Sequence, residues 1–123
     1  MHEPNKEPSK EAIEKVKTEH ADRSVYHIEI DQDGETYHFL MTGPSEPEYK
    51  KFRSEILAAK GSEADQTDLI DEAIKKAALA QIRWPAREAV SALFKHFPAI
   101  HHRFRDEIHK AAGTSAEVRA KKL

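Results

Sequence analysis

The 123-residue chain contains no cysteine, only four glycines and one tryptophan, and it has no long run of apolar residues. Without cysteine there is no disulfide framework, no thiolate zinc site and no thiol nucleophile. The glycines stand far apart, so none of them builds a phosphate-binding loop. Because no stretch of about 18 apolar residues occurs and the first residues are polar, we expect no membrane span and no secretory signal. These absences predict a soluble, cytoplasmic protein.

An excess of charge of one sign is also lacking, because 20 Lys and Arg residues stand against 22 Asp and Glu residues. The balance hides a gradient along the chain. Residues 1–48 hold 5 basic and 12 acidic side chains, residues 49–82 hold 6 and 6, and residues 83–123 hold 9 and 4. Such polarity favours an acidic partner at the basic end or head-to-tail self-association, although ordinary solvated faces give the same pattern.

The first 24 residues form a charged extension with little apolar surface. Pro4 and Pro8 lie among charged residues, which predicts disorder over residues 1–8. The following segment, SKEAIEKVKTEH, has helical composition but only three apolar residues on one stripe. We expect a partly disordered extension that contains at most a short, weakly anchored helix.

A β-hairpin is predicted over residues 25–41, where VYHIEIDQDGETYHFLM alternates apolar and polar residues around Asp33-Gly34. This pair favours a type I′ turn, because both positions tolerate positive φ. The turn sets a register in which three apolar pairs share one face: Tyr26 with Met41, Ile28 with Phe39, and Ile30 with Tyr37. The other face is polar and places His38 opposite Glu29, which we interpret as a pH-sensitive cross-strand pair.

Four helices are predicted after the hairpin, at about residues 46–60, 67–83, 86–97 and 98–112, followed by a basic tail over residues 114–123. Ser45 and Glu48 form a capping box at the start of the first helix. Pro85 ends the second helix, and Gly113 caps the last one. The predicted fold is therefore α+β and mainly α, a hairpin followed by a compact bundle of about four helices, in one domain over residues 25–113.

The core-facing stripes of these helices follow from their apolar spacing. In the first helix the stripe contains Tyr49, Phe52, Ile56 and Leu57, all expected to be buried. The tail is expected to hold a further helical turn near residues 116–122.

Four of the eight histidines lie in HFPAIHHRFRDEIHKAAG, residues 96–113, where a metal site has to be considered. His102 and His109 are seven residues apart, roughly 10 Å along a helix, which is too far for one ion. His101 and His102 are placed on the flank or outside of the last helix. Neither HExxH nor GxSxG occurs. We therefore expect exposed histidines, with no metal, no cofactor and no enzymatic activity.

The order of elements from the hairpin onward resembles the tail assembly chaperones of long-tailed bacteriophages and prophages. The resemblance covers residues 25–113 and includes YHFLMTGPSEPEYKKF, an apolar-Pro step at the end of a core helix, the short helix LFKHFP and a last helix ending in AG. The matching positions are Phe39, Pro44, Phe52, Trp84, Pro85, Leu93, Phe97, Pro98, Ile108 and Gly113.

The resemblance implies a non-enzymatic function in the cytoplasm of a bacterial host. Proteins of this family bind the tape measure protein, keep it soluble, help to recruit tail tube subunits and associate with themselves. A chaperone of a long helical client needs an apolar groove with a charged rim. The candidates for this surface are large apolar anchors with flanking cations: Trp84, Phe94, Phe97, Phe104, Arg83 and Arg87.

Two other interpretations remain open at this point. Each aromatic anchor also fits the protein's own core, and Arg83 and Arg87 also fit the solvated ends of two helices. The alternative function is a small DNA-binding or regulatory protein that uses its basic C-terminal helices. Nucleic acid is the less favoured partner, because Asp106 and Glu107 interrupt the basic surface and the whole chain is slightly acidic.

Overall fold

The structure is a computed structural model that describes residues 5–61, 66–114 and 116–123. It is α+β and mainly α, as predicted. The elements run in the order α1 (Lys10–Glu19), β1 (Val25–Gln32), β2 (Glu35–Thr42), α2 (Glu46–Lys60), α3 (Gln66–Gln81), β3 (Ile82–Trp84), α4 (Arg87–His96) and α5 (Arg103–His109). A 3-10 turn, Ile100–His102, precedes α5, and a π turn, Lys110–Thr114, follows it.

The hairpin of β1 and β2 has the predicted register. Ile28 lies opposite Phe39, and the pairs on either side of it also match the prediction. Asp33 has a φ of 53° and Gly34 a φ of 78°, the two positive values that a type I′ turn requires. The turn residues and the alternation of apolar residues therefore determine the same pairing.

The sheet has a third strand that the sequence did not predict. The helix expected over residues 67–83 ends at Gln81, and Ile82–Trp84 pairs antiparallel with β2. The strand order is β1-β2-β3, so β2 is central. Two causes explain the difference. Trp84 precedes a proline and is therefore disfavoured in a helix. The outer edge of β2 has unpaired backbone groups in a simple hairpin, and Ile82–Trp84 pairs with them.

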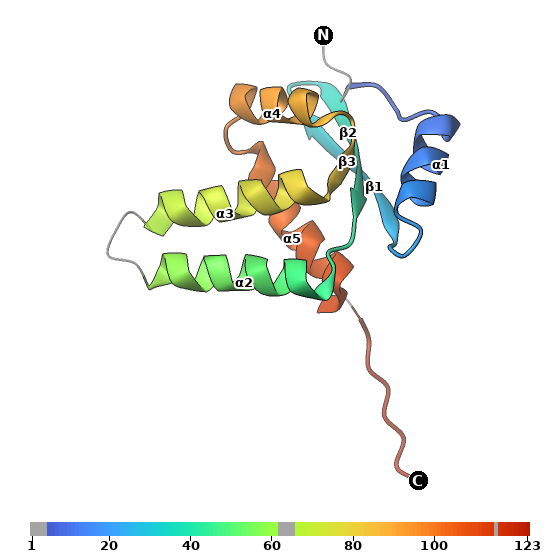
Figure 1. Ribbon diagram of the computed structural model, residues 1–123, viewed down its shortest axis with the longest axis vertical. Coiled ribbons are helices and arrows are strands. Elements are labelled where there is room, and N and C mark those ends of the chain that lie inside the picture. Colours follow the sequence, from blue (N-terminus) through green and yellow to red (C-terminus); the bar gives the residue numbers. More distant parts are fainter. Residues whose placement is uncertain (1–4, 62–65, 115) are drawn as a thin grey trace.

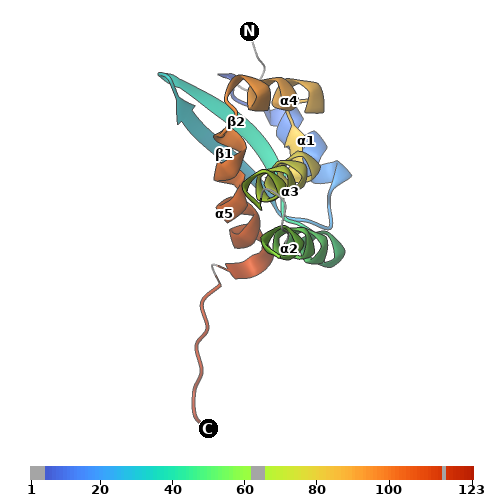
Figure 2. The same ribbon diagram turned by 90° about the vertical axis from the view of Figure 1, so that its left-hand side faces the viewer.

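Helices cover both faces of this sheet. Figures 1 and 2 show α3, α4 and α5 on one side and α1 on the other, with α2 packed beside α3. Consequently all six residues from Tyr37 to Thr42 are buried. The face of β2 expected to be polar and solvated is buried too, since His38 is 6% and Leu40 1% exposed.

The N-terminal extension is part of the fold from residue 5 onward. In α1 the hydroxyl of Ser9 accepts a hydrogen bond from the backbone of Ala12, and Val16 is only 4% exposed. Pro8 is buried, and Arg23 forms an ion pair of 2.8 Å with Glu48 at the start of α2. The short helix allowed for in this extension is therefore present as α1, with Val16 as its buried residue. The predicted disorder of residues 1–4 lies outside the described residues.

The C-terminal part differs from the predicted single helix over residues 98–112. It is divided into the 3-10 turn, α5 and the π turn. Gly113 adopts a φ of 115° and ends the helical segment, as its predicted cap role requires. Residues 116–123 are exposed and contain no helical turn, contrary to expectation, and they extend away from the body (Figure 1).

The main core lies between the sheet and α3, α4 and α5. Phe39 of β2 packs edge-on against Phe104 of α5, with ring centroids 5.0 Å apart, and Phe94 of α4 lies 6.0 Å from the same ring. All three rings are almost completely buried. Phe104 therefore joins the last helix to the central strand.

We predict that Phe104→Ala lowers the free energy of unfolding by about 3–5 kcal/mol, because it removes a fully buried ring and leaves a cavity. The matched control is Leu57→Ala on α2, whose side chain is 72% exposed; its effect should stay within about 0.5 kcal/mol. Urea unfolding followed by circular dichroism measures both. Equal effects of the two substitutions would contradict this placement of α5.

Candidate functional site

The structure separates the predicted partner-binding residues into two groups. Phe94 and Phe104 are 1% and 0% exposed, so they are core residues and do not line a surface groove. Trp84 and Phe97 are half-buried, Arg83 is half-buried, and Arg87 is exposed on α4. Phe97 packs edge-on against Tyr37 at 5.9 Å, near the hairpin end, whereas Trp84 lies opposite Leu40 in the sheet. These residues do not form one apolar groove.

Arg83 belongs to a polar network beneath the sheet end. Its Nε donates a hydrogen bond of 3.0 Å to the hydroxyl of Thr42, which donates in turn to the buried side-chain oxygen of Gln81 at 3.0 Å. Arg23 also donates to Gln81 and pairs with Glu48. Burial and the charge of Arg23 lower the pKa of Arg83, while Glu48 opposes this. These contacts give Arg83 a structural role within the fold, in addition to its predicted role in partner binding.

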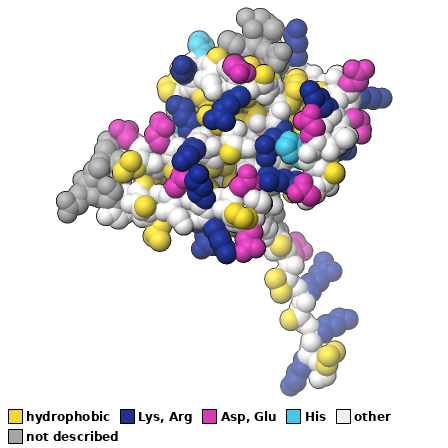
Figure 3. Space-filling model, viewed as in Figure 1, with side chains coloured by type: hydrophobic (Ala, Val, Ile, Leu, Met, Phe, Trp, Pro, Cys, Tyr) yellow, Lys and Arg dark blue, Asp and Glu magenta, His cyan; other side chains and the backbone are white. Residues whose placement is uncertain are grey.

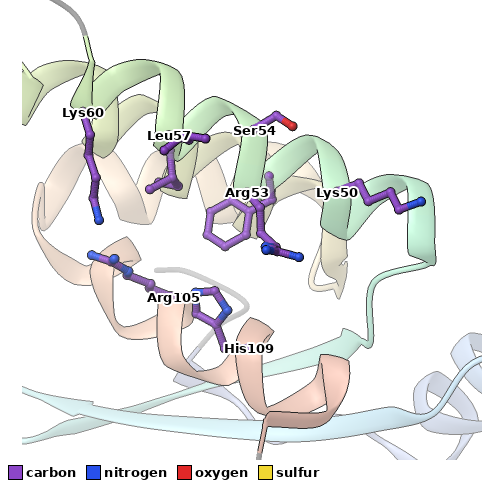
Figure 4. Close-up of a pocket in the computed structure, with 9 residues that line it drawn as sticks. Lys50, Arg53, Ser54, Leu57, Lys60, Arg105 and His109 are labelled. Atoms are coloured by element: carbon purple, nitrogen blue, oxygen red, sulfur yellow. The ribbon is translucent and has the colours of Figure 1, made fainter.

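A groove between α2 and α5 is lined by side chains from both helices. We call it the α2–α5 groove and define it by its lining residues, Lys50, Phe52, Arg53, Ser54, Ile56, Leu57, Lys60, Arg105 and His109. It has a volume of about 560 Å³. Figure 4 shows Arg105 and His109 reaching from α5 toward α2, with Arg53 and Lys60 extending from α2 on the opposite side. The predicted partner-binding set contains none of these residues. His109 had been considered only as a metal ligand, and Arg105 belongs to the basic C-terminal helices of the DNA-binding alternative.

The floor of the groove is apolar and its rim is basic. Leu57 was predicted to be buried but is 72% exposed, because Phe52, Ile56 and Ala59 already supply the contacts of α2 with the rest of the fold. No acidic side chain lines the groove among the described residues. Lys50 is paired with Glu46 at 2.9 Å, so the positive charge comes mainly from Arg53, Lys60 and Arg105.

His109 lines the groove from the side of α5. Its Nδ1 lies 2.8 Å from the hydroxyl of Tyr49, and its ring packs against Phe52 with centroids 5.4 Å apart. Burial lowers the pKa of His109, and the charges of Arg105 and Arg53 lower it further against the opposing effect of Asp106. His109 therefore favours the neutral form in the folded protein, and it is not the freely exposed histidine that the sequence predicted.

His101 is also buried, contrary to the expectation that it lies outside. It is 1% exposed, and its Nε2 lies 2.8 Å from Oδ1 of Asp71 on α3. The neighbouring His102, whose side chain is 46% exposed, places its Nε2 2.5 Å from the same oxygen. Both rings of the 3-10 turn thus reach Asp71 on α3.

The surface seen in Figure 3 carries charged side chains of both signs, with hydrophobic side chains scattered between them. The extended tail carries basic side chains, among them Arg119, Lys121 and Lys122. Within the described ranges no helix combines the length and the apolar character needed to cross a membrane.

Comparisons with known proteins show the fold alone. The chain matches no protein-family model, and no curated protein matches it in sequence. A solved structure of an uncharacterised protein from Bacillus stearothermophilus has the same overall arrangement, with a TM-score of 0.64 over 89% of this chain and 99% of that chain. The two sequences are 20% identical. The hairpin-and-helix arrangement is therefore shared with a distant protein.

The lowered pKa of His109 predicts a pH-dependent stability. Its folded pKa lies below the ordinary value of 6.5, so the unfolded chain binds the proton more readily. The stabilisation is fully present above pH 6.5 and is lost as the pH falls toward the folded pKa. We expect the urea midpoint to drop between about pH 7.5 and 5.5, and to drop less in His109→Gln.

The matched control for this experiment is His96→Gln on the exposed surface of α4. This substitution should leave the pH dependence as it is in the unmodified protein. An unchanged slope in His109→Gln would contradict the assignment of this pH dependence to His109.

Proposed function

We propose that this protein is a non-enzymatic tail assembly chaperone of a long-tailed phage or prophage, which binds the tape measure protein in the cytoplasm of the bacterial host. The proposal rests on the sequence resemblance over residues 25–113. The structural observation that supports it is the α2–α5 groove, an apolar floor with a basic rim. Such a surface suits a helical segment that carries an apolar stripe flanked by acidic side chains.

The groove has the chemistry required for a soluble chaperone of a helical client. Leu57, one of the lining residues, offers an exposed apolar side chain that loses its contact with water when a client helix docks. Arg53 and Lys60 of α2 and Arg105 of α5 surround it. Their like charge attracts an acidic client and accelerates the encounter, and it also discourages basic partners.

Self-association and recruitment of tail tube subunits belong to the same proposal. The hairpin end carries Asp31, Asp33 and Glu35, all exposed, whereas the α2–α5 groove is basic. Copies of the chain can therefore meet head to tail through unlike charges, the arrangement that produces rings or open helical assemblies. Trp84, Phe97 and Arg87 remain candidates for these further contacts.

The test of client binding is co-expression with the tape measure protein encoded beside this chain. We expect the two proteins to elute together at moderate salt. The double substitution Arg53→Glu and Lys60→Glu should abolish the complex, because it reverses the rim charge without removing a buried side chain. Lys95→Glu, an equally exposed charge reversal on α4 outside the candidate residues, is the matched control and should leave the complex intact.

Each other outcome has a distinct meaning. Loss of the complex in Arg87→Glu or Trp84→Ala, with the groove variant unaffected, would move the client to the Trp84 surface. A chain that elutes alone while the tape measure protein precipitates would contradict the chaperone function. In that case DNA binding through the basic C-terminal helices becomes the favoured function, and a duplex mobility shift that weakens steeply with salt would reveal it.

A further inference from the structure

Three metal-ligating side chains meet on the face of the hairpin that points away from the main core. Glu29 of β1 and His38 of β2 lie directly opposite each other in the register, and His27 precedes Glu29 by two residues. Since successive side chains of a strand alternate between faces, all three project from the same face, opposite to Phe39. The ligand atoms lie within 4.8 Å of one another.

The distances between these atoms lie on either side of the distance between two ligands of a single ion. Nε2 of His27 lies 3.0 Å from Nδ1 of His38, and Oε1 of Glu29 lies 3.9 Å from each nitrogen. Atoms that share a tetrahedral zinc ion at about 2.0–2.1 Å are about 3.3 Å apart. The point in their plane that is equidistant from the three atoms lies about 2.1 Å from each. A tetrahedral ion lies out of this plane, so the two nitrogens move apart and the carboxylate moves inward by a few tenths of an ångström when the ion binds.

Hydrogen bonding alone does not account for the carboxylate. At 3.9 Å, Oε1 of Glu29 is beyond hydrogen-bond distance of both rings. The two imidazoles share one contact of 3.0 Å, in which one nitrogen donates to the other. A cation placed between them would instead bind both nitrogens and the carboxylate oxygen together.

We propose that His27, Glu29 and His38 bind a zinc ion through two imidazole nitrogens and one carboxylate oxygen. Zinc suits this donor set, which is borderline in softness and contains no thiolate. The side chains of His27 and Glu29 are 35% and 57% exposed, so the ion enters from solvent and a fourth position is open to water. His38, only 7% exposed, anchors the site to the central strand.

A second cluster, formed by Asp71, His101 and His102, has the ligand types but a different geometry. Both Nε2 atoms lie at hydrogen-bond distance, 2.8 and 2.5 Å, from one oxygen of Asp71, which is closer than ligands of a common ion lie. Nδ1 of His101 is buried without a partner. Binding a metal through Nε2 would move the ring proton to this buried atom, at a desolvation cost. The cluster is therefore best described as two rings hydrogen-bonded to one carboxylate.

This site departs from the sequence-based expectation of no metal. That expectation came from residues 96–113, where we judged a metal site by the distance between histidines along one helix. The hairpin site depends instead on a cross-strand neighbour. Its rigid strands hold the three side chains in place before the ion binds, which favours affinity.

The test is zinc titration of the full chain after removal of metal with a chelator, followed by calorimetry. We expect one zinc ion per chain, and a loss of affinity of roughly a hundredfold or more in His27→Gln and in Glu29→Gln, since each removes one of three ligands. Both side chains are exposed, so these variants should fold. His102→Gln is the matched control and should bind zinc like the unmodified chain.

Two further readouts separate a bound ion from a general effect on folding. Cobalt bound in place of zinc should give a visible absorption band in the unmodified chain and in His102→Gln, but not in His27→Gln. Zinc should raise the melting temperature of the same two proteins and leave that of Glu29→Gln unchanged. Absence of binding, binding that survives loss of His27 and Glu29, or binding lost in His102→Gln would each overturn the proposal.

Discussion

The burial of β2 on both faces and both edges is the constraint on which the rest of the structure depends. Six consecutive residues, Tyr37 to Thr42, are buried. A strand in that position needs a layer of helices on each side and a neighbouring strand on each edge. Helices α3, α4 and α5 cover one face and α1 covers the other. The strands β1 and β3 pair with the two edges. The fold is therefore arranged around one short segment in the first third of the chain.

Local chemistry explains which parts of the fold were predictable from the sequence. Asp33-Gly34 and the alternation around it determine the hairpin register within a few residues. Ser45 and Glu48 form both hydrogen bonds of the predicted capping box. In contrast, β3 has only three residues, too few to show the alternation of a strand. It forms because it pairs with the edge of β2, about forty residues earlier in the chain. A strand that depends on so distant a partner cannot be predicted from its own residues.

The candidate sites were less predictable, because they depend on which side of an element becomes covered. Aromatic size suggested Phe94 and Phe104 as partner anchors, but the same property makes them core residues. Leu57 follows the spacing of the apolar stripe of α2, but Phe52 and Ile56 make the contacts with the core. The side chain of Leu57 lies at the surface. Arg53 and Arg105 meet only because α2 and α5 pack beside each other. Spacing along the chain cannot reveal such pairs.

The position of α1 has a consequence for where the folding unit begins. The resemblance and the hairpin pattern both start at Val25, which invites a boundary there. A chain shortened to that residue would lose α1, which packs against β3 on one side of the sheet, and would leave Glu48 without Arg23. An uncovered, partly apolar sheet face is a surface for aggregation. The smallest independently soluble unit therefore has to begin before Ser9, and α1 acts as an intramolecular lid on the sheet.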